Sequence, residues 1–258
     1  MKARDALSEA EQRLAAAGVE TPRVDAEWIV AHILGTTRSG VYARLDDDVE
    51  LDGLVDRRAA REPLAYVLGE WGFRRLILKT DRRALVPRPE TEILVERALA
   101  LVHDVEQPRV LDIGVGSGAI ALALKDERPD ADVVGVDVSE DALSLARENA
   151  ARLELEVELR RGDESAAAEG WDLVVSNPPY VDSLIGLQPE LSFEPHVALL
   201  GEGFHERIGA TAQARAIVLE VGDGQADDVG RALRAHSWND VAITPDLAGV
   251  DRVVEGRR

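Results

Sequence analysis

From residue 91 onward, short apolar segments alternate regularly with segments that have the periodicity of amphipathic helices. The strand-like segments cover residues 109–113, 132–137, 156–163, 171–177 and 215–222. This alternation predicts a parallel, doubly wound α/β sheet with helices on both faces. Two final strands, at residues 240–246 and 251–256, are joined by too few residues for a helical crossover, so we expect them to pair antiparallel.

The first sixty residues are typical of short helices instead. Apolar residues recur at helical spacing at Ala3, Leu7, Ala10 and Leu14. Further helices are expected near residues 22–34, 39–45 and 51–61. Residues 73–86 are strand-like on both sides of a predicted turn at Thr80-Asp81, which indicates a β-hairpin. The chain is thus expected to comprise a helical bundle at 1–72, a hairpin linker at 73–90 and an α/β domain at 91–258.

The composition is that of a globular protein, with 45% hydrophobic and 31% charged residues in a chain of 258. The absence of cysteine excludes disulfides, thiolate zinc sites and cysteine nucleophiles. No uninterrupted apolar stretch approaches the roughly 18 residues that a membrane span needs, so no membrane partner is expected. The N-terminal segment is charged and lacks the apolar stretch of a secretory signal, so we expect a cytoplasmic protein.

Charge is distributed unevenly along the chain. Residues 1–80 carry 12 basic and 14 acidic side chains, a net of −2, whereas residues 81–258 carry 18 and 35, a net of −17. A field of that sign repels phosphate backbones, so we expect no direct nucleic-acid substrate. One basic cluster is either a solvated strand face or a docking surface for an acidic or nucleic-acid-rich partner. It comprises Arg74, Arg75, Lys79, Arg82, Arg83 and Arg88.

A glycine-rich turn joins the strand at 109–113 to the helix that follows it. Gly114, Gly116 and Gly118 allow backbone N–H groups to approach a ligand closely at a helix N-terminus. Asp137, at the end of the next strand, is suited to accept hydrogen bonds from ribose hydroxyls. The pattern predicts an adenosine-containing cofactor without specifying which one, because Gly114, Gly116 and Ala119 also fit a dinucleotide-binding motif.

A second motif, Asn177-Pro178-Pro179-Tyr180, comes at the end of the strand that begins at Trp171. The two prolines stiffen the backbone and remove two N–H donors, which leaves carbonyl groups as acceptors. The side-chain oxygen of Asn177 and the carbonyl of Pro178 are suited to accept both protons of a planar NH2 group, with the ring of Tyr180 against it. Accepting both protons in this way favours attack on an electrophile by a nitrogen whose lone pair is otherwise delocalised.

Together with Asp163 at the end of the strand at 156–163, these motifs resemble class I S-adenosylmethionine-dependent methyltransferases that act on exocyclic or amide nitrogen. PLAYVLG at residues 63–69 and LVPRPETE at 85–92 resemble the linker of the release factor glutamine methyltransferases, the PrmC/HemK family. The resemblance covers essentially the whole chain. It implies an α/β fold with a seven-stranded Rossmann-like methyltransferase sheet, whose last strand is antiparallel, and a small N-terminal helical bundle that docks the substrate protein.

The resemblance implies S-adenosylmethionine as cofactor, S-adenosylhomocysteine as product, and class 1 peptide chain release factors as partners. The methyl acceptor would be the side-chain amide nitrogen of the glutamine in their Gly-Gly-Gln motif. The implied cofactor-binding residues are Gly114, Val115, Gly116, Ser117, Gly118, Asp137, Asp163, Glu164 and Asn177. The implied catalytic and substrate-binding residues are Asn177, Pro178, Pro179 and Tyr180. No metal is expected, and the five histidines show no ligand spacing.

Two features depart from the family pattern. Gly72 stands where an acidic residue is expected before Phe73, and the segment at 200–214 looks short enough for a helix of the family to be shortened or missing. An N6-adenine or N2-guanine methyltransferase acting on DNA or RNA is the main alternative, because a flipped base presents a comparable NH2 group. A nicotinamide dehydrogenase would use the glycine turn but has no need of Asn177, and a non-catalytic interaction module would need neither motif intact.

Overall fold

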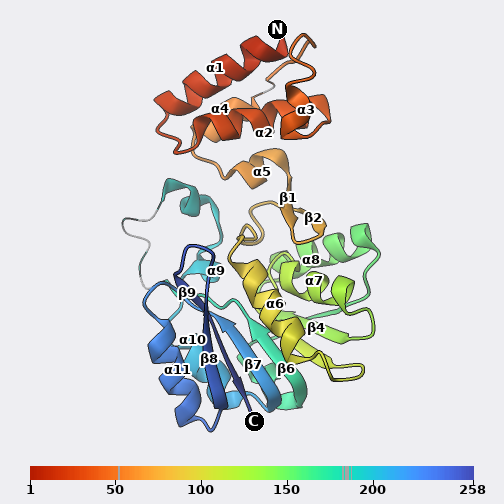
Figure 1. Cartoon of the computed structure of the whole chain (residues 1–258), viewed down its shortest axis with the longest axis vertical. Helices are drawn as coiled ribbons and strands as arrows, with labels where there is room; N and C mark the ends of the chain where they lie inside the picture. Colours follow the sequence, from red (N-terminus) through yellow and green to blue (C-terminus); the bar gives the residue numbers. More distant parts are fainter. Residues whose placement is uncertain (52, 182, 184–185, 187) are drawn as a thin grey trace. The chain divides into compact units, whose positions relative to one another are not determined.

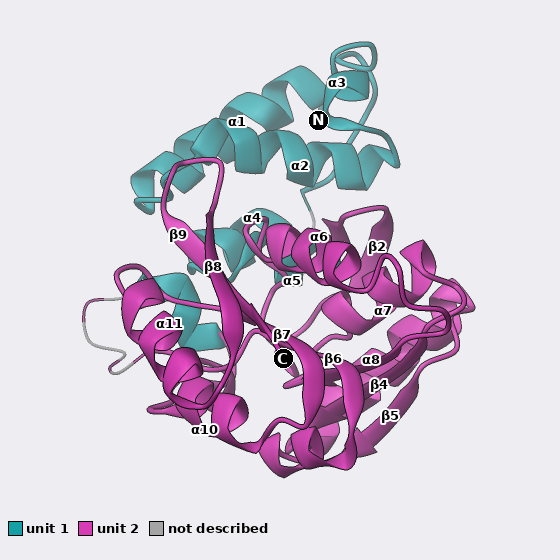
Figure 2. Ribbon diagram, turned by 60° about the horizontal axis from the view of Figure 1, so that its bottom comes forward, with its two compact units in different colours: residues 1–70, 187–193 teal, residues 71–186, 194–258 magenta. Residues whose placement is uncertain are grey.

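The structure is a computed structural model that describes residues 1–258 except residues 52, 182, 184–185 and 187. The chain divides into two compact units, coloured teal and magenta in Figure 2. The first unit holds residues 1–70 and 187–193, and the second holds residues 71–186 and 194–258.

The first unit is helical. Its helices are α1 (Ala3–Ala16), α2 (Pro22–Leu34), α3 (Arg38–Val41), α4 (Leu54–Ala59), α5 (Leu64–Leu68) and the 3-10 helix η2 (Pro189–Phe193). The apolar positions that predicted the first helix are all buried. The helices expected at 39–45 and 51–61 are shorter than predicted, because α3 already ends at Val41 and Gly53, in the left-handed region, precedes α4.

Ion pairs explain why a segment remote in sequence belongs to this helical unit. Glu190 on η2 accepts hydrogen bonds from Arg61 at 2.7 and 2.8 Å and from Arg58 at 2.9 Å. Arg58 is itself buried and pairs with the buried Asp25 at 2.6 Å. Buried arginine and carboxylate groups require such partners, so this network fixes residues 189–193 to α4 and α2.

The second unit contains a seven-stranded sheet with the order β5-β4-β3-β6-β7-β9-β8. Its strands are β3 (Arg109–Ile113), β4 (Asp132–Asp137), β5 (Glu158–Arg161), β6 (Trp171–Ser176), β7 (Ala214–Glu220), β8 (Asn239–Pro245) and β9 (Asp251–Arg257). The first five run parallel, and β9 is antiparallel to both β7 and β8. The predicted doubly wound sheet and its antiparallel last strand are therefore confirmed.

Helices cover both faces of this sheet (Figure 1). One face packs against α6 (Thr91–Leu101), α7 (Ala119–Glu127) and α8 (Glu140–Leu153), and the other against α10 (Phe204–Thr211) and α11 (Ala226–Ala235). Alternate residues of a strand point to opposite faces, so Val110 joins the core under α6–α8 while Leu111 joins the core under α10 and α11. Burial on both faces explains why the middle of the central strands is apolar, as at Leu173–Val175 of β6 and Ala216–Leu219 of β7.

The hairpin lies earlier than predicted. It is formed by β1 (Glu70–Phe73) and β2 (Leu76–Lys79), so the predicted turn at Thr80-Asp81 and the strand after it are wrong. The actual turn contains Arg74 in the left-handed region, with φ of 50°. Arg74 is held there because its backbone N–H donates to the Glu92 carboxylate at 3.0 Å and its side chain pairs with Glu127. These are tertiary contacts that turn preferences do not include.

The segment between the Asn177 turn and β7 does contain a regular helix. The short α9 (His196–Leu199) comes first, and the eight-residue α10 follows Gly203, which adopts the left-handed conformation. Ile208 of α10 is fully buried, and Gly209 allows the side chain of Leu233 to approach closely. The helix expected to be shortened or missing is thus present at eight residues.

Candidate active site

A pocket opens where the carboxyl ends of β3, β4, β5 and β6 meet, all within the second unit. Ligands of open α/β sheets bind at this edge. The lining residues are 83–88, 91, 113–117, 119–120, 137–139, 142, 162–164, 176–179, 195, 197–198 and 204. Ten of the predicted site residues are among them: Gly114, Val115, Gly116, Ser117, Asp137, Asp163, Glu164, Asn177, Pro178 and Pro179. Gly118 and Tyr180 are not.

The glycine-rich turn presents bare backbone to the pocket. The N–H groups of Gly114 and Val115 both donate to the carbonyl of Val136, at 2.8 and 3.0 Å, which turns the chain sharply at the end of β3. Gly114 has φ of 74°, and a Cβ on it would meet no atom within 4 Å. A side chain there would project into open space that a ligand can fill, and the left-handed backbone favours glycine.

Gly118 serves the packing of the turn rather than the pocket. It has φ of 88°, and a Cβ on it would lie 2.9 Å from the side chain of Leu122 and 3.4 Å from Ala146. The missing side chain therefore lets α7 start directly against α8.

Asp137 lies at the end of β4, half-exposed on the pocket wall. One carboxylate oxygen accepts from the backbone N–H of Gly116 at 3.0 Å, and the other accepts from that of Ser139 at 2.9 Å. Each oxygen retains acceptor capacity, because a carboxylate has about four lone-pair sites. The side chain is thus fixed in orientation and still able to accept two hydroxyl groups.

Asp163 and Glu164 reach the same pocket, but each already has a partner. Asp163 caps the 3-10 helix η1 (Glu164–Glu169) and accepts from both the N–H and the hydroxyl of Ser165, which lowers the pKa of Asp163. Glu164 pairs with Arg207 at 2.6 Å. Nearby, Val138 and Val197 line the pocket and are 49% and 55% exposed, which provides apolar surface for a flat ring.

Asn177 lies on the pocket wall at the end of β6. The preceding Ser176 is fully buried, and its hydroxyl donates to the carbonyl of Ile113 at 2.7 Å, so the turn is anchored to the central strand. The Nδ2 group of Asn177 donates to the hydroxyl oxygen of Thr91 at 3.3 Å. With Nδ2 engaged by Thr91, Oδ1 is the side-chain atom of Asn177 that is suited to accept a hydrogen bond from a ligand.

Tyr180 lies behind the turn. A Cβ on Gly222 would be 3.0 Å from its ring, and burial raises the pKa of its hydroxyl to about 12. Its carbonyl accepts from Gln225, whose side-chain oxygen accepts from the N–H of Gly222. In this structure Tyr180 therefore fixes the turn from behind, and the predicted stacking on a substrate stays a prediction.

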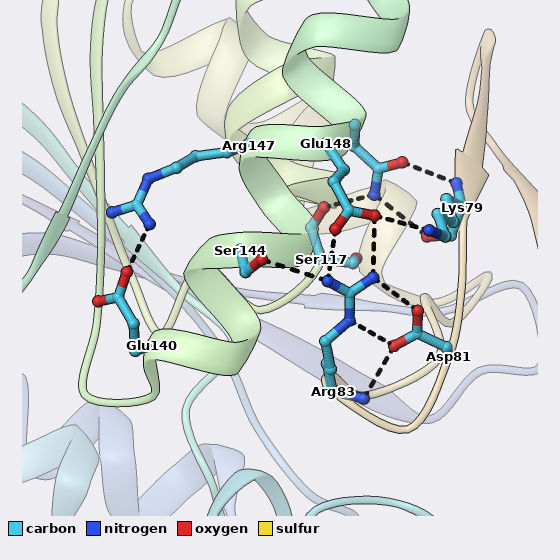
Figure 3. Close-up of polar contacts among 9 residues, drawn as sticks. Lys79, Asp81, Arg83, Ser117, Glu140, Ser144, Arg147 and Glu148 are labelled. Carbon is cyan, nitrogen blue, oxygen red and sulfur yellow. Dashed lines mark hydrogen bonds and ion pairs between the residues drawn. The ribbon is translucent and has the colours of Figure 1, made fainter.

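The wall formed by residues 83–88 is the largest part of the pocket that the motifs did not predict. Arg83, the first residue of this wall, is anchored by ion pairs with Asp81 and with Glu148 of α8, each at 2.7 Å (Figure 3). Lys79 pairs with the same Glu148 at 2.7 Å, and the two cations lower the pKa of Glu148 to about 2. The segment that carries the wall is thereby attached to α8.

Asn149, also on α8, attaches the same segment to the glycine-rich turn. Its oxygen accepts from the backbone N–H of Lys79 at 2.7 Å, and its amide group donates to the carbonyls of Lys79 and Ser117 at 3.1 and 2.9 Å. The side chain is fully buried, so these bonds replace those to water. The sequence does not predict this bridging role of Asn149, because an asparagine inside a helical pattern gives no local signal of its tertiary contacts.

Most of the predicted basic cluster is neutralised by intramolecular pairs. Arg74, Arg75, Lys79, Arg83 and Arg88 pair with Glu127, Asp126, Glu148, Asp81 and Glu194. Glu194 is buried, and it also accepts from the backbone N–H of Val86 at 3.0 Å, which ties residues 83–88 to the start of α9. Lys79, Arg83 and Arg88 thus position the pocket wall, and all five cations have acidic partners, so the cluster gives little support to a nucleic-acid surface.

Among the described residues, no three His, Cys, Asp or Glu side chains come close enough together to hold a metal ion. In the same part of the chain, no helix is both long enough and apolar enough to span a membrane.

Two family models match the sequence. Residues 5–69 match the PrmC N-terminal domain, and residues 90–188 match the methyltransferase small domain. A release factor glutamine methyltransferase of Deinococcus radiodurans is 40% identical over 278 aligned residues, covering 100% of this chain and 99% of that protein. A protein of the same name from Geobacter sulfurreducens is 39% identical over 264, covering 95% of this chain and 92% of that protein.

Two solved structures resemble the fold at low sequence identity. The catalytic domain of hMettl16 in complex with the MAT2A 3′UTR hairpin 1 has a TM-score of 0.58 and 16% identity, covering 79% of this chain and 80% of that chain. A methyltransferase from Pyrococcus furiosus has a TM-score of 0.51 and 18% identity, covering 70% of this chain and 87% of that chain. At these identities the likeness concerns the fold alone.

Proposed function

The chain belongs to the release factor glutamine methyltransferases, and from this premise we propose that it methylates the glutamine of the Gly-Gly-Gln motif in class 1 peptide chain release factors. The chain is an S-adenosylmethionine-dependent methyltransferase. The proposal adds the acceptor atom, which is the side-chain amide nitrogen N5 of that glutamine.

The glycine-rich end of the pocket fits the cofactor. When bound, S-adenosylmethionine supplies an electrophilic methyl group on a positively charged sulfur. Gly114 and Gly116 offer a backbone surface without side chains, and Asp137 keeps acceptor capacity for the two ribose hydroxyls. Asp163 and Glu164 would flank the adenine beside the exposed apolar surface of Val138.

The other end of the pocket fits a planar amide. An amide nitrogen is a weak nucleophile because its lone pair is delocalised into the carbonyl group. Asn177 Oδ1 and the carbonyl of Pro178 would each accept one N–H of the substrate, which draws electron density onto the nitrogen and fixes its orientation. The nitrogen would release one proton to water as it gains the methyl group, and this chemistry would require no nucleophilic side chain of the enzyme.

The single observation that carries the proposal is that both motifs line one pocket. Gly114 and Asp137 come from the ends of β3 and β4, and Asn177 and Pro178 come from the end of β6, which pairs with β3. A cofactor held at the first two strands would therefore have its reactive end beside the acceptors at the third.

Methylation of an adenine N6 or guanine N2 atom is the alternative, since the same acceptors suit a base amine. The net charge of −17 over residues 81–258 and the pairing of the basic cluster count against it. The two are separated by incubating the enzyme and labelled S-adenosylmethionine with purified release factor or with bulk nucleic acid in parallel. We expect label in the release factor only; label confined to nucleic acid would reverse the assignment.

A further inference from the structure

A buried carboxyl group lies behind Asn177. Glu220 is the last residue of β7, and because Ser176 pairs with Leu219 in the register of β6 and β7, Glu220 lies beside Asn177 at the same sheet edge. Its side chain is fully buried, and neither carboxyl oxygen has a hydrogen-bond partner of normal geometry among the described residues. A buried acid without a clear partner is costly to stability and calls for a reason.

The surroundings of Glu220 connect it to the pocket. The side chains of Thr91 and Asn177 approach closely enough to favour its ionised form, and Arg252 acts in the same direction, while Glu90 opposes it. Burial is the largest effect and raises the pKa of Glu220 to about 7. The backbone carbonyl of Glu220 accepts a hydrogen bond from Nε2 of the buried His205 at 2.8 Å, which holds the end of the strand in place.

Thr91 lies between the two groups. It is the first residue of α6, is 4% exposed and lines the pocket. Its hydroxyl oxygen accepts from Asn177 Nδ2 at 3.3 Å, which leaves its own proton free to be donated to a carboxylate. In a chain of hydrogen bonds from Asn177 through Thr91 to Glu220, the direction of donation is set by the last group, because a carboxylate can only accept.

The orientation of the Asn177 amide decides what the site can do. Rotation by half a turn exchanges Oδ1 and Nδ2, and only the orientation with Oδ1 toward the pocket accepts a proton of a substrate NH2 group. The opposite orientation would present a donor to a donor.

We propose that Glu220 is a positioning residue that, through Thr91, holds the Nδ2 group of Asn177 away from the pocket, so that Oδ1 faces the substrate amide. The inference rests on the proposed function, since it assigns a role to Glu220 in the same amide chemistry. Glu220 itself touches neither substrate nor cofactor.

The first test is kinetic and uses the whole enzyme with its release factor substrate. Glu220→Gln keeps the shape but replaces a group that only accepts with an amide that also donates, so the orientation of Asn177 is no longer fixed. We expect kcat to fall at least about tenfold, with KM for the release factor and the cofactor nearly unchanged. Thr91→Val should reproduce this loss, and Thr91→Ser should restore activity because it retains the hydroxyl. Glu255→Gln is the matched control, since Glu255 is 5% exposed on β9 and pairs with Arg97.

The second test does not require activity. The chain has three asparagines, Asn149, Asn177 and Asn239, so asparagine labelling with ¹⁵N gives three side-chain amide signals. We expect the Asn177 signal to move between a pH of about 6 and about 8 as Glu220 ionises, and to lose this movement in Glu220→Gln while the Asn149 signal stays in place.

Two results would overturn the inference. One is a Glu220→Gln enzyme with the kcat of the wild type. The other is a reduced kcat with an Asn177 signal identical in the two proteins, which would mean that Glu220 acts through something other than Asn177. A wild-type enzyme that leaves the release factor unmethylated would instead contradict the proposed function. If the wild-type enzyme methylates the release factor and the Glu220→Gln enzyme does so equally fast, only the role of Glu220 is contradicted.

Discussion

The two ends of the pocket are built in different ways. The glycine-rich end consists of backbone turns and a half-exposed carboxylate, Asp137, whose contacts lie within a few residues of the ends of β3 and β4. The Asn177 end depends on side chains from separate elements, because the half-buried Asn177 after β6 has the buried Thr91 of α6 and the buried Glu220 of β7 behind it. Backbone geometry suits a cofactor that many enzymes share, whereas a fixed side-chain orientation suits a single reacting group.

This difference predicts that changes at the two ends affect different kinetic constants. Asn177→Ala removes the side-chain acceptor for the substrate amide, so kcat should fall roughly 100- to 1,000-fold, the usual effect of losing one polar group that acts in the transition state. Cofactor affinity, measured by calorimetry, should stay close to that of the wild type. Loss of cofactor binding in this variant would show that the two ends are not separate.

Glu220→Gln sharpens the comparison through stability. The pKa of Glu220 is raised from 4.5 to about 7, so the folded state retains a proton that the unfolded state releases between these values, and stability falls as the pH rises through that window. Removing the group should therefore stabilise the protein above neutral pH by up to about 3 kcal/mol, with little effect below a pH of about 4. Urea unfolding of both proteins across this range measures the difference, and parallel curves would contradict it.

Asp137→Ala tests the cofactor end. It removes the acceptor of the Gly116 and Ser139 N–H groups together with the predicted ribose contact, so the dissociation constant for S-adenosylmethionine should rise about tenfold to a hundredfold. At saturating cofactor, kcat should fall much less than in Asn177→Ala. An Asp137→Ala enzyme with normal affinity for S-adenosylmethionine and a low kcat would contradict the roles given to the two ends of the pocket.

The smallest effect is expected for the wall that runs beside both ends. Arg83→Gln breaks the pairs with Asp81 and Glu148, which are partly exposed, so the free energy of unfolding should fall by about 1 kcal/mol or less. We expect a few-fold weaker cofactor affinity that approaches the wild-type value at high salt, because screening weakens such pairs in the wild type as well. A salt-independent defect would indicate a direct contact of Arg83 with the cofactor.

The same contrast explains what the sequence could predict. The order and bounds of β3 and β4 followed from local pattern, as did the glycine turn, Asp137 and the Asn177 turn. The hairpin turn at Arg74 was missed because its contacts with Glu92 and Glu127 come from remote helices.

The supporting residues of the site were missed for a similar reason. Thr91, Asn149 and Glu220 each lie within an ordinary helix or strand pattern, where a threonine, an asparagine or a glutamate gives no local signal. Their contacts appear only once the elements have packed together. Local motifs thus predict the groups that face a ligand, and the tertiary fold supplies the groups that orient them.

The most direct test of the central claim is peptide mapping of a class 1 release factor after incubation with the enzyme and S-adenosylmethionine. Mass spectrometry should locate a single added methyl group on the glutamine of Gly-Gly-Gln, and Asn177→Ala enzyme should leave the same peptide unmodified. A methyl group on any other residue, or an unmodified release factor beside methylated nucleic acid, would contradict the account.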